Sequence, residues 1–242
     1  MARRVLGSIF RWWLRGRSRQ FPFDAASVTL IFAPHQDDET LGCGGLIPLL
    51  IEAGHQVRIT YITDGSGSHP DDPTVAGRRR AEALAATTQL GVSPEHLEFL
   101  DARDGSLAWL NEQEAMRIVA QISSTLNRVQ PTLVLLPCRA DGSSEHDAAF
   151  TLFDRALTAT GRHPRVLEFP IWSWWNPLLL RRPLRSSRRI WRASFPGHAA
   201  KKRHALSAYV TQVKPAGAGQ GPVLTPAFLS FFAAAEEFFF EH

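Results

Sequence analysis

The feature that most constrains the fold is a strand-like segment that runs into a polar cluster and then into a glycine-bearing segment. Residues 28–32 are mostly apolar and rich in β-branched side chains, as in a buried strand. The run stops before Pro34, and His35, Asp37 and Asp38 follow at once. In open α/β sheets, the loops at the carboxyl ends of the strands line the binding crevice. We therefore expect a site at the end of this strand.

Two interpretations fit this cluster. A turn between His35 and Asp38 would bring an imidazole and a carboxylate onto one cation and leave Asp37 to face whatever the metal binds. Alternatively, the acids lie against the macrodipole at a helix N-terminus, and the histidine is an incidental loop residue. A second cluster favours the metal. The continuous apolar run 132–136, typical of a strand in a parallel sheet, leads into a polar segment that contains His146.

The polar segments after both strands carry recognisable motifs. Residues 34–45, P-H-Q-D-D-E-T-L-G-C-G-G, resemble the P-H-P-D-D-E-x-L-G-C-G-G signature of the PIG-L (LmbE-like) zinc de-N-acetylases. Residues 141–149, D-G-S-S-E-H-D-A-A, are similar to that family's D-G-H-x-D-H-x-A-A. The resemblance extends from about Val28 to the end of the chain. It implies a Rossmann-like three-layer α/β/α domain with a mostly parallel sheet.

The resemblance also implies a chemistry. His35, Asp38 and His146 would hold Zn²⁺, with Fe²⁺ as an alternative because a site of two histidines and a carboxylate binds either metal. Asp37, which is not a ligand, would act as the general base. The expected reaction removes an N-acetyl group from an N-acetylglucosamine-type sugar conjugate, with acetate and a free amine as products.

Three positions depart from the family pattern. Gln36 replaces a proline, which costs backbone stiffness but no ligand, and Glu145 replaces an aspartate. Ser143 replaces a histidine that in the family stabilises the developing oxyanion. Two alternatives therefore stay open: a metal-dependent amidase or esterase that acts on another acyl group, and a sugar-binding relative with impaired catalysis.

Two further residues are candidates for the substrate pocket. Arg79 and Glu82 fit the family's R-x-x-E, in which the arginine belongs to the pocket, although the same spacing also makes a surface ion pair on a helix. Asp104 matches an aspartate that faces sugar hydroxyls, but an aspartate before Gly105 is also an ordinary turn residue.

The pattern along the chain alternates strands and helices. We expect helices at 41–53, 75–90, 111–129 and from the second motif to about 160, and strands at 56–63, 96–100 and 166–172. Lys201, Ala205, Leu206 and Tyr209 are similar to a C-terminal family helix, and residues 227–242 are expected to form an apolar helix. No internal repeat or linker divides residues 23–242, which we interpret as one deacetylase domain.

The leader, residues 1–22, differs from the rest in composition. It carries six arginines and no acid. Its apolar run is broken by Arg11 and is too short to span a bilayer, and no small-residue cleavage site follows it, so we expect neither a membrane span nor a signal peptide. Val5, Leu6, Ile9, Phe10 and Trp13 would share one face of a helix. Peripheral contact of this basic amphipathic helix with a membrane is one hypothesis. Packing on the domain, or a disordered arm, is the alternative.

Charge and cysteine usage limit the partners and the compartment. The formal net charge of +4 and the pI near 9.6 describe a moderately basic surface, from which we predict no nucleic-acid partner. Cys43 and Cys138 form no C-x-x-C pair and do not indicate a disulfide framework. We therefore expect a cytoplasmic protein, with contact at the inner membrane face if the leader binds lipid.

Overall fold

The fold is built on one twisted sheet of eight strands. The computed structural model describes residues 2–23, 27–139, 141–215 and 221–241. The strands are β1 (Arg19–Gln20), β2 (Val28–Ala33), β3 (Gln56–Thr63), β4 (Leu97–Ala102), β5 (Leu133–Pro137), β6 (Arg165–Phe169), β7 (Arg189–Ser194) and β8 (Glu236–Glu241). They lie in the order β1-β7-β8-β6-β5-β2-β3-β4, and every neighbouring pair is parallel except the two that involve β8.

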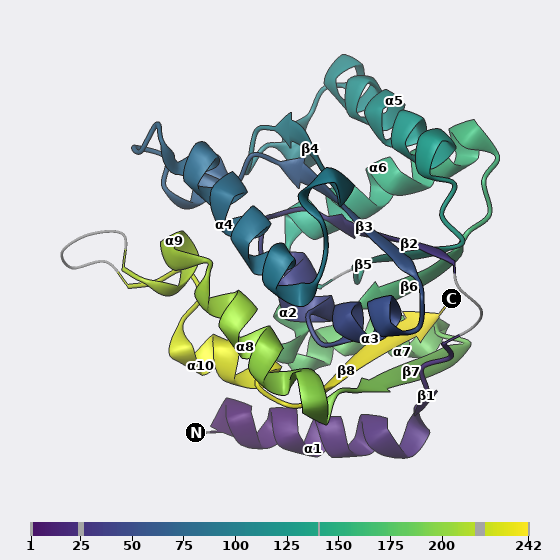
Figure 1. The fold of residues 1–242 in the computed structure, drawn as a ribbon, viewed down its shortest axis with the longest axis vertical. Helices are drawn as coiled ribbons and strands as arrows, with labels where there is room; N and C mark the ends of the chain where they lie inside the picture. Colours follow the sequence, from purple (N-terminus) through teal and green to yellow (C-terminus); the bar gives the residue numbers. More distant parts are fainter. Residues whose placement is uncertain (1, 24–26, 140, 216–220, 242) are drawn as a thin grey trace.

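Helices cover both faces of this sheet (Figure 1). They are α1 (Ala2–Arg17), α2 (Asp38–Cys43), α3 (Leu46–Glu52), α4 (Val75–Leu90), α5 (Glu112–Val129), α6 (Ser144–Thr160), α7 (Arg181–Ser186), α8 (Ala199–Ser207), α9 (Val210–Val213) and α10 (Pro226–Leu229). The side chains of α5 and α6 pack on Leu30, Phe32 and Val134. Those of α3, α4 and α8 share the opposite core with Ile31 and Leu135. The expected Rossmann-like three-layer architecture is confirmed.

The direction of strand progression reverses at the centre of the sheet. From β2 the chain moves outward to β3 and β4, and it then crosses to β5 on the other side of β2. The two central strands pair in parallel register, with Thr29 opposite Leu133 and Ile31 opposite Leu135. Loops that leave neighbouring strands in opposite directions open a crevice at their carboxyl ends. The segments with both sequence motifs therefore leave the sheet at this switch point.

Several elements follow directly from local sequence signals. Helix α5 begins after Asn111, whose side chain accepts a hydrogen bond from Glu114 N while the Glu114 carboxylate accepts one from Asn111 N, a complete capping box. The single helix expected at 41–53 is instead two helices, α2 and α3, separated at Gly44 and Gly45. A Cβ on Gly45 would lie 2.2 Å from a ring carbon of Phe195. The break therefore lets the chain pass close to that ring.

The prediction of a C-terminal helix was wrong. Residues 227–242 begin with the end of α10 and a short 3₁₀ helix, and the chain then forms strand β8. Phe238, Phe239 and Phe240 are all buried, because β8 inserts antiparallel between β6 and β7 and has helices against both of its faces. A short apolar run without alternation does not distinguish a buried strand from a helix.

A buried ion pair joins α8 to this strand. Lys202 Nζ lies 2.6 Å from Glu237 Oε1, and the Glu237 carboxylate also accepts hydrogen bonds from Gly45 N and Leu46 N at the start of α3. Burial raises the pKa of Glu237, and the charge of Lys202 opposes this rise. Lys201, the residue assigned to the family helix from the sequence, is exposed. The lysine of this helix that makes a buried contact is therefore Lys202, which lies three residues before Ala205, and not Lys201.

Helix α1 packs against β7 and β8, at the bottom of Figure 1. Leu14 is fully buried, and Arg11 donates hydrogen bonds to the carbonyl oxygens of Phe231 and Glu236. Arg15 Nε lies 2.8 Å from the Glu236 carboxylate. One side of the leader helix therefore packs on the domain, as one of the two alternatives predicted. Within the described residues, none of the helices has the length and apolarity needed to cross a bilayer.

Candidate active site

The first motif folds into a tight loop between β2 and α2. His35 lies in the loop, and Asp38 is the first residue of α2. Asp38 Oδ2 accepts a hydrogen bond from His35 N at 3.0 Å and lies 3.3 Å from His35 Nδ1, so one carboxylate fixes both ends of the loop. Glu39, the third acid, is buried and accepts hydrogen bonds from Tyr209 Oη and Thr40 Oγ1, which gives it a role in holding the fold.

The second motif brings His146 to the same place. His146 lies in the first turn of α6, just after β5, and its Nε2 is 3.5 Å from Asp38 Oδ2. One ligand-type atom from each of His35, Asp38 and His146 lies within 4.8 Å of the others. Within the described part of the chain, the buried His146 Nε2 has no hydrogen-bond partner. A buried nitrogen left without a partner beside a carboxylate and a second imidazole is the donor set expected for a divalent cation.

Each histidine of this set also has a carboxylate on its other ring nitrogen. His35 Nε2 lies 3.1 Å from Asp104 Oδ1, and His146 Nδ1 lies 3.2 Å from Asp141 Oδ2. Asp141 is itself fixed, because it accepts hydrogen bonds from the backbone N–H groups of Ile171, Trp172 and Ser173. Carboxylates in this position hold the tautomer and orientation of metal-binding histidines.

The charges of these groups are strongly coupled. Burial lowers the pKa of His35, but Asp104 and Asp38 outweigh burial and raise it to about 10. Burial likewise lowers the pKa of His146, and the charge of Asp38 with the hydrogen bond of Asp141 raises it to about 9. Burial raises the pKa of Asp38, but the two histidines bring it well below its usual range. The pocket therefore favours positive charge beside Asp38.

Asp37 lies beside this set and has a different environment. Its side chain is nearly buried, and Oδ2 is 3.4 Å from Nη2 of Arg79. Burial raises the pKa of Asp37 to about 7, although the positive charge of Arg79 opposes the rise. Arg79 is almost completely buried and also donates a hydrogen bond to Gln36 O at 2.6 Å, so it is held by the loop itself. A carboxyl group with a pKa near neutrality is suited to accept and return a proton.

Glu145 adds a further carboxylate on the Asp104 side of His35. Its Oε2 is 3.9 Å from His35 Nε2 and accepts a hydrogen bond from Gly105 N at 3.2 Å. Burial raises the pKa of Glu145, and the charge of His35 opposes the rise. His35, Asp104 and Glu145 form a second group whose ligand-type atoms lie within 4.8 Å of one another. This group shares His35 with the first, so we treat the two as one site.

A cavity of about 500 Å³ opens over these residues. Its lining comes from eight stretches of the chain: His35, Asp37, Asp38, Leu41, Gly67, Ser68, Arg79, Asp104, Gly142, Ser143, Ser144, Ile171, Trp172, Gln212, Val223 and Leu224. Ser143 lines the cavity and also caps α6, because its Oγ accepts a hydrogen bond from His146 N at 3.4 Å. A sugar ring with an acyl group fits a volume of this size.

A family model confirms the resemblance. The model of the PIG-L family, described as GlcNAc-PI de-N-acetylase, matches residues 30–157, which is more than half of the chain. The chain belongs to the PIG-L family. The matched range contains both motif segments and therefore every residue that we predicted for the site.

Individual relatives agree with this assignment. The diacetylchitobiose deacetylase of Thermococcus kodakarensis is 31% identical over 147 residues, which are 58% of this chain and 52% of that protein. The chain thus spans about half the length of this curated relative. Among solved structures, the A40926 pseudoaglycone deacetylase superposes with a TM-score of 0.67 at 18% identity, covering 90% of this PIG-L chain and 97% of the other. A deacetylase of teicoplanin biosynthesis gives 0.68 at 16% identity, with 89% and 97% covered.

The structure brings the predicted site residues together at one place. Five of them line the cavity, namely His35, Asp37, Asp38, Arg79 and Asp104, and His146 lies just behind Asp38. Their roles stay predictions. Sequence reasoning missed Asp141, although an aspartate five residues before a candidate histidine ligand, at the same strand end, was a usable signal. It also missed Gln212 and Trp172 as cavity residues, because only the fold brings their segments to the strand ends.

Proposed function

We propose that this protein is a metal-dependent hydrolase that removes an N-acetyl group from an N-acetylglucosamine-type sugar conjugate. The observation that carries the proposal is the meeting of His35, Asp38 and His146 at the switch point of the sheet, with His146 Nε2 buried and unpartnered. Membership of the PIG-L family supports it, as does a relative that is a diacetylchitobiose deacetylase.

His35, Asp38 and His146 would hold the metal, which we propose to be Zn²⁺ with Fe²⁺ as the alternative. When bound, such a cation lowers the pKa of water from about 15.7 towards 7 and polarises the acyl carbonyl. Asp104 and Asp141 keep the imidazoles oriented through their second nitrogens. Metal analysis of anaerobically purified protein identifies the cation.

Asp37 is the proposed general base. It faces the cavity without being a ligand, so it can take a proton from the attacking water and return it to the leaving nitrogen. Arg79 would keep Asp37 in position through their 3.4 Å contact and, as part of the cavity lining, would bind the substrate. We propose that Asp104, whose Oδ2 accepts a hydrogen bond from Gly67 N, also faces the hydroxyl groups of the sugar.

The test is the release of acetate. Purified, metal-loaded protein is incubated with N-acetylhexosamine conjugates, and acetate and free amine are measured against a relative of known activity. Product from these substrates supports the proposal. Release from other acylated amines or esters alone would favour the amidase or esterase alternative, and no release from any substrate would overturn the hydrolase assignment.

A sugar-binding protein with impaired catalysis is the second candidate, and one observation favours it. Ser143 occupies the cavity wall where the family has a histidine, and its hydroxyl already caps α6. Binding of an N-acetylglucosamine conjugate without turnover would establish this alternative.

The remaining parts of the proposal concern organisation and place. We treat residues 23–242 as the deacetylase domain and residues 1–22 as a leader. We propose a cytoplasmic location, which the two buried, free thiols of Cys43 and Cys138 support. We also propose that the leader makes peripheral contact with a membrane, which would not involve the residues of the active site.

A further inference from the structure

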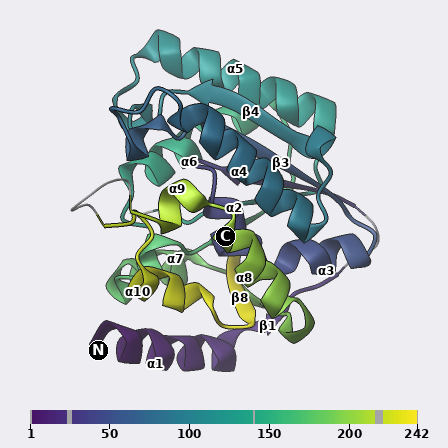
Figure 2. The ribbon, with the colours of Figure 1, turned by 60° about the vertical axis from the view of Figure 1, so that its left-hand side comes forward.

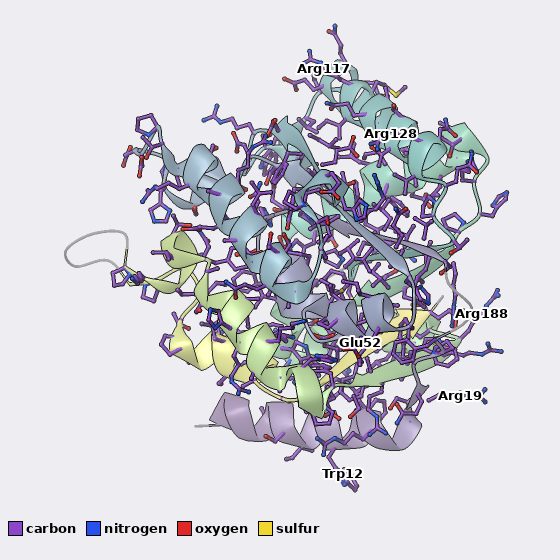
Figure 3. All side chains as sticks on the ribbon, viewed as in Figure 1. Trp12, Arg19, Glu52, Arg117, Arg128 and Arg188 are labelled. Atoms are coloured by element: carbon purple, nitrogen blue, oxygen red, sulfur yellow. The ribbon has the colours of Figure 1, made fainter. Side chains whose placement is uncertain are left out.

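The outer side of α1 is apolar and is not covered by the fold. Leu6, Ile9 and Trp12 follow one another at intervals of three residues and are 55%, 57% and 72% exposed. Figure 3 shows Trp12 pointing away from the molecule at its lower edge. Leu178, in the neighbouring 3₁₀ helix η5 (Pro177–Leu180), is 69% exposed. Large apolar side chains exposed together on one surface indicate an interaction site more than scattered single residues do.

A groove of about 680 Å³ runs between these two elements. It is lined by Leu6, Ile9, Phe10, Trp13, Trp175, Asn176, Pro177 and Leu178. Apart from the tryptophans, Asn176 has the one polar side chain among the described residues of this lining, and its Oδ1 already accepts a hydrogen bond from Leu178 N. We call the groove together with Leu6, Ile9, Trp12 and Leu178 the α1–η5 face.

The chain segments that form this face are basic and contain no acid. Residues 1–23 and 169–235 contain sixteen lysines and arginines and no aspartate or glutamate, whereas residues 24–168 contain twenty of the 23 acids. Of the helices in these acid-free segments, α1, α7, α8 and α10 lie in the lower part of the molecule, whereas α9 lies higher, beside α4 (Figures 1 and 2). The three remaining acids lie in β8, where Glu236 pairs with Arg11 and Glu237 with Lys202. Arg181 and Arg185, which follow η5 directly, are exposed.

We propose that the α1–η5 face docks on an anionic lipid bilayer. Leu6, Ile9, Trp12 and Leu178 would enter the boundary between headgroups and acyl chains, while the surrounding arginines attract anionic headgroups. Apolar side chains beside basic ones on a surface helix are the combination that binds such interfaces. The partner is identified by both properties together, because neither the groove nor the charge alone requires lipid.

Two other occupants fit the face less well. A second copy in a twofold contact would place the basic surroundings of both faces against each other, and like charges at close range oppose association. A nucleic acid would match the charge, but its phosphates offer nothing for Leu6, Ile9 and Leu178 to bury against. A bilayer satisfies both requirements.

The proposed docking face adjoins the catalytic cavity. Trp172 lines the cavity, and Trp175 to Leu178 line the groove, so one short segment of chain contributes to both. Phe228 packs against both Trp172 and Trp175, at ring-centre distances of 4.7 and 6.1 Å. Docking would therefore hold the cavity near the lipid surface without inserting any cavity residue.

Vesicle sedimentation with the full chain tests the proposal and requires no catalysis. The protein is mixed with vesicles of phosphatidylcholine alone or with about one third phosphatidylglycerol, at low and high NaCl. We expect binding to the anionic vesicles that weakens with salt, since the attraction is screened. Trp12→Ala should weaken it at least about tenfold. Trp109→Ala is the matched control, because Trp109 is 83% exposed but lies in the acid-rich part of the chain.

A charge pair gives a second, independent comparison. Arg181→Glu with Arg185→Glu should weaken binding at least about tenfold, since two basic residues that attract anionic headgroups are replaced by acidic ones that are repelled. Arg103→Glu with Arg117→Glu, also exposed, should leave binding unchanged. Absent binding overturns the proposal. So does equal binding by all variants, or dimerisation that Trp12→Ala abolishes, which would assign the face to a second copy. Retention by DNA but not by anionic vesicles would overturn it as well.

Discussion

Asp37 is the residue whose substitution best separates catalysis from metal binding, because it faces the cavity but is not among the ligand-type atoms that meet. Asp37→Asn keeps the shape of the side chain and removes its basicity. We expect acetate release to fall by about 10²–10⁴-fold, the usual contribution of a general base. Metal content, measured on the same preparation, should not change. A variant that retains near-normal turnover would exclude Asp37 as the base.

Asp141 should act through His146 rather than on the substrate. Asp141→Asn weakens the hold on His146 Nδ1 and should lower metal affinity by about 10–100-fold. Competition with a chelator measures this affinity. Asp154→Asn, on an exposed part of the same helix α6, is the control and should leave it unchanged. Equal affinities for both variants would show that Asp141 only joins loops.

Ser143 lines the cavity and also caps helix α6, at the position where the family has a histidine. Ser143→His should increase kcat if an imidazole there donates to the developing oxyanion, since one such donor is worth about 2.7–4 kcal/mol. The same change removes a helix cap, which costs about 1 kcal/mol of stability. Ser143→Ala loses the cap without gaining the donor and is therefore the control. A kcat of Ser143→His no higher than that of Ser143→Ala would mean that position 143 does not face the acyl group.

At the scale of elements, local signals predicted the strands around the site and the helices between them. Strands β2, β3 and β5 and helices α4 and α6 appear close to their expected bounds because each has a clear period or a polar end. The site followed from the same logic, since parallel strand ends share one edge of the sheet. β8 was not predictable in this way, because its burial depends on partner strands far away in the sequence, of which the nearest paired residue, Ser194 of β7, lies 42 residues before Glu236. Asp141 and His146 both belong to the second motif, but the contact between their side chains could not be predicted from the sequence.

The ion pair between α8 and β8 makes a prediction for these elements. Lys202→Met leaves the buried Glu237 carboxylate without its cation and should lower the free energy of unfolding by about 3–5 kcal/mol, as breaking a buried pair generally does. Lys201→Met, at the exposed neighbouring position, should change it by less than about 0.5 kcal/mol. Urea denaturation of both variants decides the matter. Equal effects would show that the pair does not hold α8 and β8 together.

At the scale of the whole molecule, the open question is whether α1 belongs to the same cooperative unit as the sheet. Its contacts are with the far end of the chain: Arg11 and Arg15 pair with Glu236, and Gly7 lies against the ring of Phe231. Sequence alone could not foresee these contacts, because the leader's apolar residues occupy both its inner and its outer side. Leu14, at 0% exposure, and Leu6, at 55%, represent these two sides of one helix.

The same substitution at these two positions tests the unity of the molecule. Leu14→Ala should lower the global free energy of unfolding by about 2–5 kcal/mol, because a filled core site becomes a cavity. Leu6→Ala should lower it by less than about 0.5 kcal/mol, since its side chain is already largely in water. Urea denaturation followed by circular dichroism gives both values, and amide hydrogen exchange locates the effect. If Leu14→Ala accelerates exchange in α1 but leaves the sheet as stable as before, the leader unfolds on its own and is a separate unit. A global loss would instead mean that α1 is an integral part of the fold, so that its outer side is held rigidly against the rest of the molecule.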